Sequence, residues 1–288
     1  MPDGLICKKN HKDMLSLEEI NEISKIFVKK GIKKIRLTGG EPLVRKNVET
    51  LVKMLAEIDG LEDLAMTTNG YFLKEKAKIL WENGLKRLNI SIDSLDDEKY
   101  KMISQGGDLK KVLDAIKYAQ KFSYLIKINC VLIRGFNDGE IYNFIKFSKE
   151  NNLKLRFIEL MPIGGTADFS KDKYISSDEI IKKLNLIPIK NPDENSPTSL
   201  YKVPKIDYTI GLIEPLSHKF CKTCNRLRLT ADGKIRPCLH SDLEIDLKKA
   251  IRENKDIEKL IDEALMKKPQ RHHLEKEIIK ESMFRIGG

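Results

Sequence analysis

The sequence predicts an α/β fold built from parallel strand–helix units, with a smaller α+β region after them. Two observations predict this class. Between residues 33 and 160, strand-like apolar runs alternate five times with helical patterns, at a spacing of roughly 25 to 40 residues that is typical of βα units. The unusual short motifs also follow strands directly, and the carboxyl ends of parallel strands are where barrels and open sheets bind ligands.

The individual elements follow from capping and hydrophobic spacing. Ser16 and Glu19 form a capping box before an apolar helical pattern that extends to Lys30, and Gly31 ends it. Strands are then expected at 33–37, 61–66, 86–92, 125–133 and 153–160. Helices are expected at 47–58, 74–82, 97–103, 109–122 and 140–151.

The regular alternation of strand-like and helical patterns ends after Pro162. A helix at 177–184, a polar loop at 190–198 and a strand at 208–213 are expected, with two further helices at 246–253 and 256–267. We therefore divide the chain into residues 1–165 and residues 166–288.

Composition limits the function classes. No apolar run approaches the roughly 18 to 20 residues of a membrane span, and no secretion leader is expected. Five cysteines, three of them clustered, favour metal ligation in a reducing compartment, so we expect a cytoplasmic protein. The net charge of +10 suits either an acidic partner or a lysine-rich surface; we favour the surface and expect no nucleic-acid binding.

The most specific stretch is His218–Leu239, which holds Cys221, Cys224 and Cys238. Three thiolates can hold an iron–sulfur cluster that keeps one iron open, or zinc with His218 or His240 as a fourth ligand, and the spacing leaves both possibilities open. Arg226 and Arg228 follow the first cysteine pair, and their bidentate donors suit a phosphorylated ligand.

Polar motifs at strand ends supply further candidates. Gly39 and Gly40 precede Glu41 and allow backbone to approach a ligand, although a simple tight turn explains them equally well. Thr67, Ser91 and Met161 occupy other strand ends, where a helix-entry turn, a capping residue and a core methionine are the simpler explanations.

Two charges occur inside expected strands. Arg36 and Lys127 are unexpected in strands that are buried on both faces. Each side chain therefore either meets an anion in the interior of the fold or marks an exposed face.

Taken together, these motifs resemble the GTP 3′,8-cyclase family of radical S-adenosylmethionine enzymes. The matching stretches run in order through LTGGEPL, TTNG, SIDSL, INCVLIRGFND, RFIELMP, HKFCKTCNRLRLTADGKIRPCL and the final Gly287-Gly288. The resemblance implies an incomplete, open (β/α) barrel whose mouth is closed by the C-terminal region. It implies a GTP-binding lyase of molybdenum cofactor biosynthesis that makes 3′,8-cyclo-7,8-dihydro-GTP.

The resemblance also implies cofactors and roles. The family uses two [4Fe-4S] clusters, one that reduces S-adenosylmethionine to a radical and an auxiliary one that holds GTP. Cys221, Cys224 and Cys238 match the auxiliary ligands, and Gly40, Glu41, Ser91 and Met161 match S-adenosylmethionine contacts. The positions that match GTP contacts are Arg36, Thr67, Lys127, Arg226, Leu227 and Arg228. Arg226 and Arg228 also match residues that help catalysis. The pathway partner is a downstream cyclic pyranopterin monophosphate synthase.

One departure is large. The family opens with a strand that carries C-x3-C-x2-C followed by Met-Pro, whereas this sequence begins at Met1-Pro2 and Cys7 has no matching position. We therefore expect the first strand and the ligands of the radical-generating cluster to be missing, through a start site assigned too far downstream; the alternative is a paralogue that lacks this cluster. Such a chain would be inactive as written. The alternatives are another radical enzyme with an auxiliary cluster, and a zinc-containing module that binds nucleotides or nucleic acid.

Overall fold

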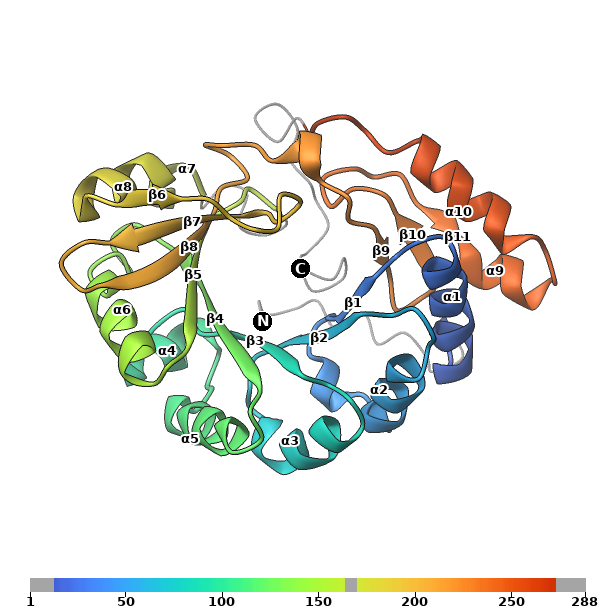
Figure 1. Cartoon of the computed structure of the whole chain (residues 1–288), viewed down its shortest axis with the longest axis horizontal. Coiled ribbons are helices and arrows are strands. Elements are labelled where there is room, and N and C mark those ends of the chain that lie inside the picture. Colours follow the sequence, from blue (N-terminus) through green and yellow to red (C-terminus); the bar gives the residue numbers. More distant parts are fainter. Residues whose placement is uncertain (1–12, 164–169, 273–288) are drawn as a thin grey trace.

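The protein is described here by a computed structural model, which describes residues 13–163 and 170–272. Figure 1 shows an arc of strands with helices on its outer side. The C-terminal elements lie beside α1 (Leu17–Lys29) at one end of the arc. Cys7 and the Gly287-Gly288 pair lie outside the described residues.

The elements have the following bounds. The helices after α1 are α2 (Val48–Ala56), α3 (Leu73–Glu82), α4 (Asp97–Ile103), α5 (Leu109–Gln120), α6 (Ile141–Glu150), α7 (Ser170–Lys173), α8 (Ser177–Leu184), α9 (Leu247–Arg252) and α10 (Ile257–Met266), with short 3-10 helices η2 (Pro42–Val44) and η4 (Cys221–Thr223). The strands are β1 (Lys34–Leu37), β2 (Asp63–Thr68), β3 (Arg87–Ser91), β4 (Leu125–Leu132), β5 (Lys154–Glu159), β6 (Ile187–Ile189), β7 (Thr198–Val203), β8 (Tyr208–Ile213), β9 (Arg228–Leu229), β10 (Lys234–Arg236) and β11 (Ile245–Asp246).

One sheet of eight strands forms the arc, in the order β1-β2-β3-β4-β5-β8-β7-β6. The strands β1 to β5 and β8 run parallel, and β7 and β6 continue the sheet antiparallel. Among the described strands, β1 pairs on one side only and is an edge of the sheet. This arrangement confirms the predicted partial α/β barrel.

Local signals placed most elements correctly. Both hydrogen bonds of the predicted capping box form, from the Glu19 amide to Ser16 Oγ and from the Ser16 amide to Glu19 Oε2. The second strand begins two residues later than expected, so that Thr67 and Thr68 lie inside β2 and not in the turn after it. Its register against β1 and β3 explains the shift, because Arg36 pairs with Ala65 and Thr67 with Asn89.

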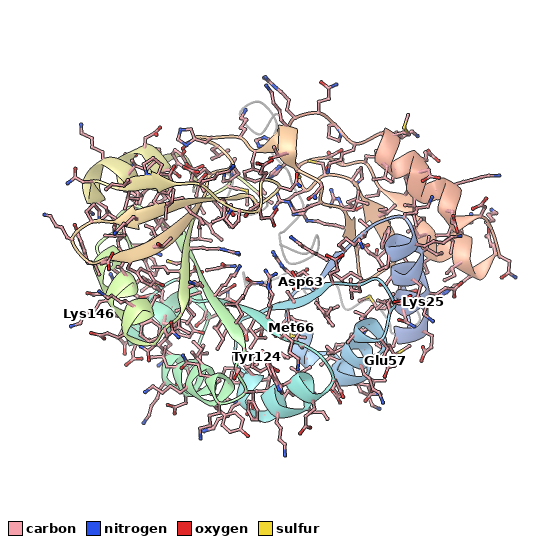
Figure 2. All side chains as sticks on the ribbon, viewed as in Figure 1. Lys25, Glu57, Asp63, Met66, Tyr124 and Lys146 are labelled. Carbon is pink, nitrogen blue, oxygen red and sulfur yellow. The ribbon has the colours of Figure 1, made fainter. Side chains whose placement is uncertain are left out.

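The apolar core of the arc lies between the sheet and its helices. Met66 and Leu88 from the strands are fully buried with Leu80 and Val112 from the covering helices. Figure 2 shows Met66 and Tyr124 on this covered side and Asp63 toward the hollow of the arc, while Lys25 and Lys146 lie at its outer rim. The inner face is thereby left for polar side chains.

A second apolar core joins the two ends of the sequence. Ile23 and Phe27 of α1 are buried against Ile235, Leu247 and Ile261 of the C-terminal elements. Ion pairs cross the same contact, among them Lys29–Glu258 at 2.6 Å, Lys30–Asp262 at 2.7 Å and Arg252–Glu19 at 2.7 Å. The C-terminal region is therefore fastened to the β1 side of the arc.

Glu159 attaches the C-terminal region to the β5 side of the arc. This buried carboxylate ends β5 and accepts hydrogen bonds from the amides of Ser177 at 2.9 Å, Leu216 at 2.9 Å and Ser217 at 3.1 Å. The hydroxyls of Tyr174, Ser177 and Ser217 donate to it as well. Burial alone would raise its pKa, but these donors together hold the pKa of Glu159 below its usual range. The ionised carboxylate thus ties β5 to α8 and to the segment before the cysteines.

The division at residue 165 remains a prediction, although β8 joins the sheet next to β5. No described helix is both long and apolar enough to cross a membrane.

The Glu159 contacts lead to a stability prediction. Glu159→Gln replaces an acceptor of six donors with an amide whose NH2 group faces donors, so the free energy of unfolding should fall by about 3 kcal/mol at pH 7. Urea unfolding followed by circular dichroism measures this. Glu150→Gln, at the exposed end of α6, is the control and should stay within about 0.5 kcal/mol of wild type. Equal effects of the two substitutions would contradict the anchoring role.

Candidate functional site

A cavity of about 1850 Å³ lies between the inner face of the sheet and the cysteine stretch. Strands β1 to β5 line one side, and residues 225–232 line the other. The loop at 191–198 also reaches the cavity, and its Asp193 pairs with Lys34 at the start of β1 at 2.9 Å. The sheet and the C-terminal region therefore enclose one common space.

Four of the cations that line this cavity come from four different strands. They are Arg36 of β1, Arg87 of β3, Lys127 of β4 and Arg156 of β5, and we call them the cationic cluster. The alternation of side chains along a strand puts these positions on the inner face of the sheet. Of the two explanations that the sequence left open for Arg36 and Lys127, their place in the cavity lining favours the one in which they meet an anion.

The cluster has little negative charge to balance it. Arg87 forms a salt bridge with Asp63, and Arg156 donates to Asn89 Oδ1 at 3.5 Å. Within residues 13–163 and 170–272, neither Arg36 nor Lys127 has a carboxylate within salt-bridge distance. The arrangement leaves positive charge available to an anion.

The pKa values express the same imbalance. Burial and the neighbouring positive charges lower the pKa of Lys127 to about 7 and that of Arg156 to about 10. Arg36 is accessible to solvent inside the cavity, yet the protein around it and the charges of Arg87 and Arg226 lower its pKa too. An anion placed among these groups would relieve the repulsion between them.

The cysteine stretch forms the opposite wall. Cys221 begins η4, Cys224 directly follows it, and Cys238 follows β10; all three are half-buried free thiols. Arg226 donates to Cys224 Sγ at 3.6 Å, and its guanidinium lies over the Phe220 ring, 4.8 Å from the centroid. Arginine and thiol therefore sit together at the edge of the cavity.

Arg226 and Arg228 connect the cysteines to the cationic cluster. Burial and the charge of Arg226 lower the pKa of Arg228 to about 10, while Cys238 and Cys224 act in the opposite direction. Because Arg226 also lowers the pKa of Arg36, the positive charge extends from β1 across to the cysteine loops. Leu227 lines the cavity between the two arginines.

The donor chemistry fits an iron–sulfur cluster. Burial opposes ionisation of Cys224, but the Arg226 amide and the charges of Arg226 and Lys268 outweigh it and hold the pKa of Cys224 below its usual range. Thiolates in such a positive environment are the usual ligands of iron–sulfur clusters. Across the described ranges, however, no three His, Cys, Asp or Glu side chains lie close enough together to hold a metal, so the fit rests on the donor types and their charge environment.

The two histidines considered as fourth ligands differ. Both ring nitrogens of His218 face carboxylates, Glu214 at 2.9 Å and Asp178 at 3.4 Å, and the hydrogen bond with Glu214 raises the pKa of His218. His240 lies beside Cys238, where burial and nearby positive charge lower its pKa to about 3. His218 is therefore occupied elsewhere, whereas His240 remains a neutral imidazole at the site.

The carboxylate of Glu41 is hydrogen-bonded within the protein. It accepts from the Leu43 amide at 3.0 Å, the Thr68 hydroxyl at 2.7 Å and the Asn69 amide at 2.7 Å. These bonds tie the turn after β1 to the end of β2. The preceding Gly39 has φ of +120°, a conformation that favours glycine.

The other strand-end candidates lie apart from the cationic cluster. Gly40 lines the cavity, whereas Glu41, Thr67, Ser91 and Met161 are outside its lining. Ser91 is exposed at the end of β3, and Met161 packs with Ile163, Leu216 and Leu239. Their roles stay predictions, and they mark the carboxyl ends of the strands above the cavity.

Three functional candidates were missed from the sequence. Arg87 and Arg156 are charges inside strands, the same signal that singled out Arg36 and Lys127, and could have been found in that way. Lys268 contacts the cysteine stretch from a distance of 44 residues in sequence, and no local pattern indicates it.

The sequence of this chain is similar to those of known protein families and of individual enzymes. Residues 7–148 match the radical SAM superfamily, and residues 153–274 match Molybdenum Cofactor Synthesis C. The chain is 48% identical to a GTP 3′,8-cyclase of Peptoclostridium acidaminophilum over 100% of this chain and 90% of the relative. It is 46% identical to a GTP 3′,8-cyclase of Alkaliphilus oremlandii over 100% of this chain and 92% of the relative.

A solved structure supports the fold alone. SuiB of Streptococcus suis bound to S-adenosylmethionine matches 88% of this chain and 59% of its own, with a TM-score of 0.60 and 14% identity. The arc of strands and part of the C-terminal region therefore have a counterpart in a known architecture.

The pKa of Lys127 leads to a binding prediction. At pH 8 most Lys127 side chains are neutral in the free protein, so binding of inorganic triphosphate should take up close to one proton. Affinity should fall as the pH rises above 7, by up to about tenfold per pH unit. Calorimetric titration in two buffers of different ionisation enthalpy measures the uptake.

Lys127→Met should abolish this proton uptake, whereas Lys25→Met, on the exposed face of α1, should preserve it. Equal uptake by wild type and Lys127→Met would show that Lys127 does not meet the anion.

Proposed function

The chain belongs to the GTP 3′,8-cyclase family of radical S-adenosylmethionine enzymes, and from this membership we propose that it serves the cyclisation of GTP to 3′,8-cyclo-7,8-dihydro-GTP. In this role it would act at the first step of molybdenum cofactor biosynthesis. The match to Molybdenum Cofactor Synthesis C over residues 153–274 supports the pathway.

The observation that carries the proposal is the cationic cluster opposite the cysteine stretch. A nucleoside triphosphate has several negative charges at one end and a neutral base at the other. Arg36, Lys127 and Arg156 offer positive charge inside one cavity, and Arg226 and Arg228 place bidentate donors at its far wall. The cavity therefore suits a ligand that is charged at one end and extends toward the cysteines.

We assign the two ends of the substrate accordingly. The triphosphate lies among the cationic cluster, where it raises the pKa of Lys127 and keeps that side chain charged. The guanine end lies toward Cys221, Cys224 and Cys238, flanked by Arg226, Leu227 and Arg228. Thr67 is outside the cavity lining but pairs with Asn89 next to Lys127 in the sheet, and from the family we assign it a contact to the nucleoside between these ends.

The cofactors are assigned from the family and from the donor set. Cys221, Cys224 and Cys238 would hold an auxiliary [4Fe-4S] cluster, and Gly40, Glu41, Ser91 and Met161 lie in the segments that would hold S-adenosylmethionine. When bound, S-adenosylmethionine with its own cluster supplies the radical that starts the reaction. The residues of this chain orient the nucleotide and exclude water from it, and Arg226 and Arg228 compensate the negative charge beside the reacting nucleoside.

We also propose a setting for this activity. The four described cysteines are free thiols, which agrees with the cytoplasm, where thiols stay reduced. The product would pass to a downstream cyclic pyranopterin monophosphate synthase.

We infer further that these 288 residues alone do not start the radical reaction, because they contain no C-x3-C-x2-C segment. Anaerobic reconstitution with iron and sulfide should give one [4Fe-4S] cluster per chain and no zinc. Incubation of this protein with S-adenosylmethionine and dithionite should give no 5′-deoxyadenosine.

Variants separate the two parts of this prediction. Cys224→Ser should lose the cluster, and Cys130→Ser, in the buried fourth strand, should keep it. Zinc in place of iron would contradict the cluster assignment, and 5′-deoxyadenosine formation would contradict the inference about the missing ligands.

A further inference from the structure

Lys268 joins the two loops that carry the cysteines. Its ammonium donates to the carbonyl oxygen of Arg226 at 2.7 Å and to that of Pro237 at 2.6 Å, and it lies 3.9 Å from Cys224 Sγ. Arg226 follows the first cysteine pair, and Pro237 directly precedes Cys238. One side chain therefore contacts the backbone next to the second ligand and next to the third.

These contacts use the whole donor capacity of the ammonium. A lysine side chain has three N–H donors and no acceptor. Two of them satisfy backbone carbonyls at short distances, and the third points to a sulfur atom. The geometry fixes the position of the positive charge beside Cys224 and leaves little freedom for the two loops to separate.

The helix that ends just before Lys268, α10, is packed into the core. Ile257, Ile261 and Ala264 of α10 are buried in the core that also contains Ile235 of β10. Strand β10 leads directly into Pro237 and Cys238. Lys268 thus connects the packed helix α10 to the two loops that carry the cysteines, although it is 42 residues away from Arg226 in the sequence.

We propose that Lys268 is a positioning residue of the three-cysteine site, which holds the two cysteine-bearing loops together and sets the reduction potential of the cluster bound there. The inference rests on the proposed auxiliary cluster. Positive charge and N–H donors near cluster sulfur atoms stabilise the more negative, reduced state. Removing the ammonium should therefore loosen the loops and make the cluster harder to reduce.

A matched pair of variants tests this. Lys268→Met keeps the length and apolar stem of the side chain and removes the charge. Lys267→Met removes the same charge one residue earlier, where the exposed side chain pairs with Glu263 of its own helix. Lys268→Arg retains the positive charge and should therefore keep the midpoint potential near that of wild type.

Two readouts besides activity are measured on reconstituted protein. Loss of iron to an excess of a chelator should be about tenfold faster for Lys268→Met than for wild type, and unchanged for Lys267→Met. The midpoint potential, followed by the electron paramagnetic resonance signal of the reduced cluster, should shift to a more negative value for Lys268→Met only. Lys268→Arg should lie near wild type in potential, which a purely structural role of Lys268 would not predict.

The outcomes distinguish this inference from the proposed function. Wild-type protein that binds no iron and sulfide would overturn the cluster and this inference together. Wild type with a cluster, but with Lys268→Met equal to Lys267→Met in both readouts, would overturn the role of Lys268 alone. Should Lys268→Met fail to fold by circular dichroism, Lys268→Gln keeps a donor without the charge, and an unchanged potential in that variant would also overturn it.

Discussion

Positive charge held on the inner face of a parallel sheet is the constraint on which this site depends. Interior positions of parallel strands are normally apolar, because a buried charge loses its hydration. Here Arg36, Lys127 and Arg156 occupy such positions together, and desolvation, with the repulsion of neighbouring cations added to it, lowers the pKa of all three. Hydrophobic residues there would give a more stable fold, so the cost of these charges points to an anionic ligand that offsets it.

The C-terminal region converts an open arc into a cavity with two chemically different walls. It is held at one end by the core shared with α1 and at the other by Glu159. Neither anchor touches the cationic cluster, yet together they place Arg226 and Arg228 across from it. The proposed substrate binding and cluster ligation would therefore depend on the same few attachments as the stability of the fold.

Much of the fold could be predicted because its signals are local. The capping box at Ser16 and the alternation of strands with amphipathic helices are set by neighbouring residues. The charges at Arg36 and Lys127 were informative because they break the apolar pattern of their strands. Arg87 and Arg156 break it in the same way, and their omission was a failure to apply the rule throughout the sheet.

Other features depend on contacts that no local pattern encodes. Strands β9 to β11 have two or three residues each, too few for a periodic signal. The packing of α1 against α9 and α10 joins residues more than 200 positions apart, as in the pair Lys29–Glu258. Lys268 is an ordinary lysine after a helix until the fold brings it to Cys224.

The central claim is that the cavity recognises a nucleotide through its phosphates on one wall and its base on the other. The most direct measurement compares GTP and guanosine binding to the reconstituted protein by calorimetry at pH 7. The account predicts that guanosine binds at least about 100-fold more weakly, since each charge-assisted contact to phosphate contributes roughly 1.5 to 3 kcal/mol. Equal affinities for GTP and guanosine would contradict it.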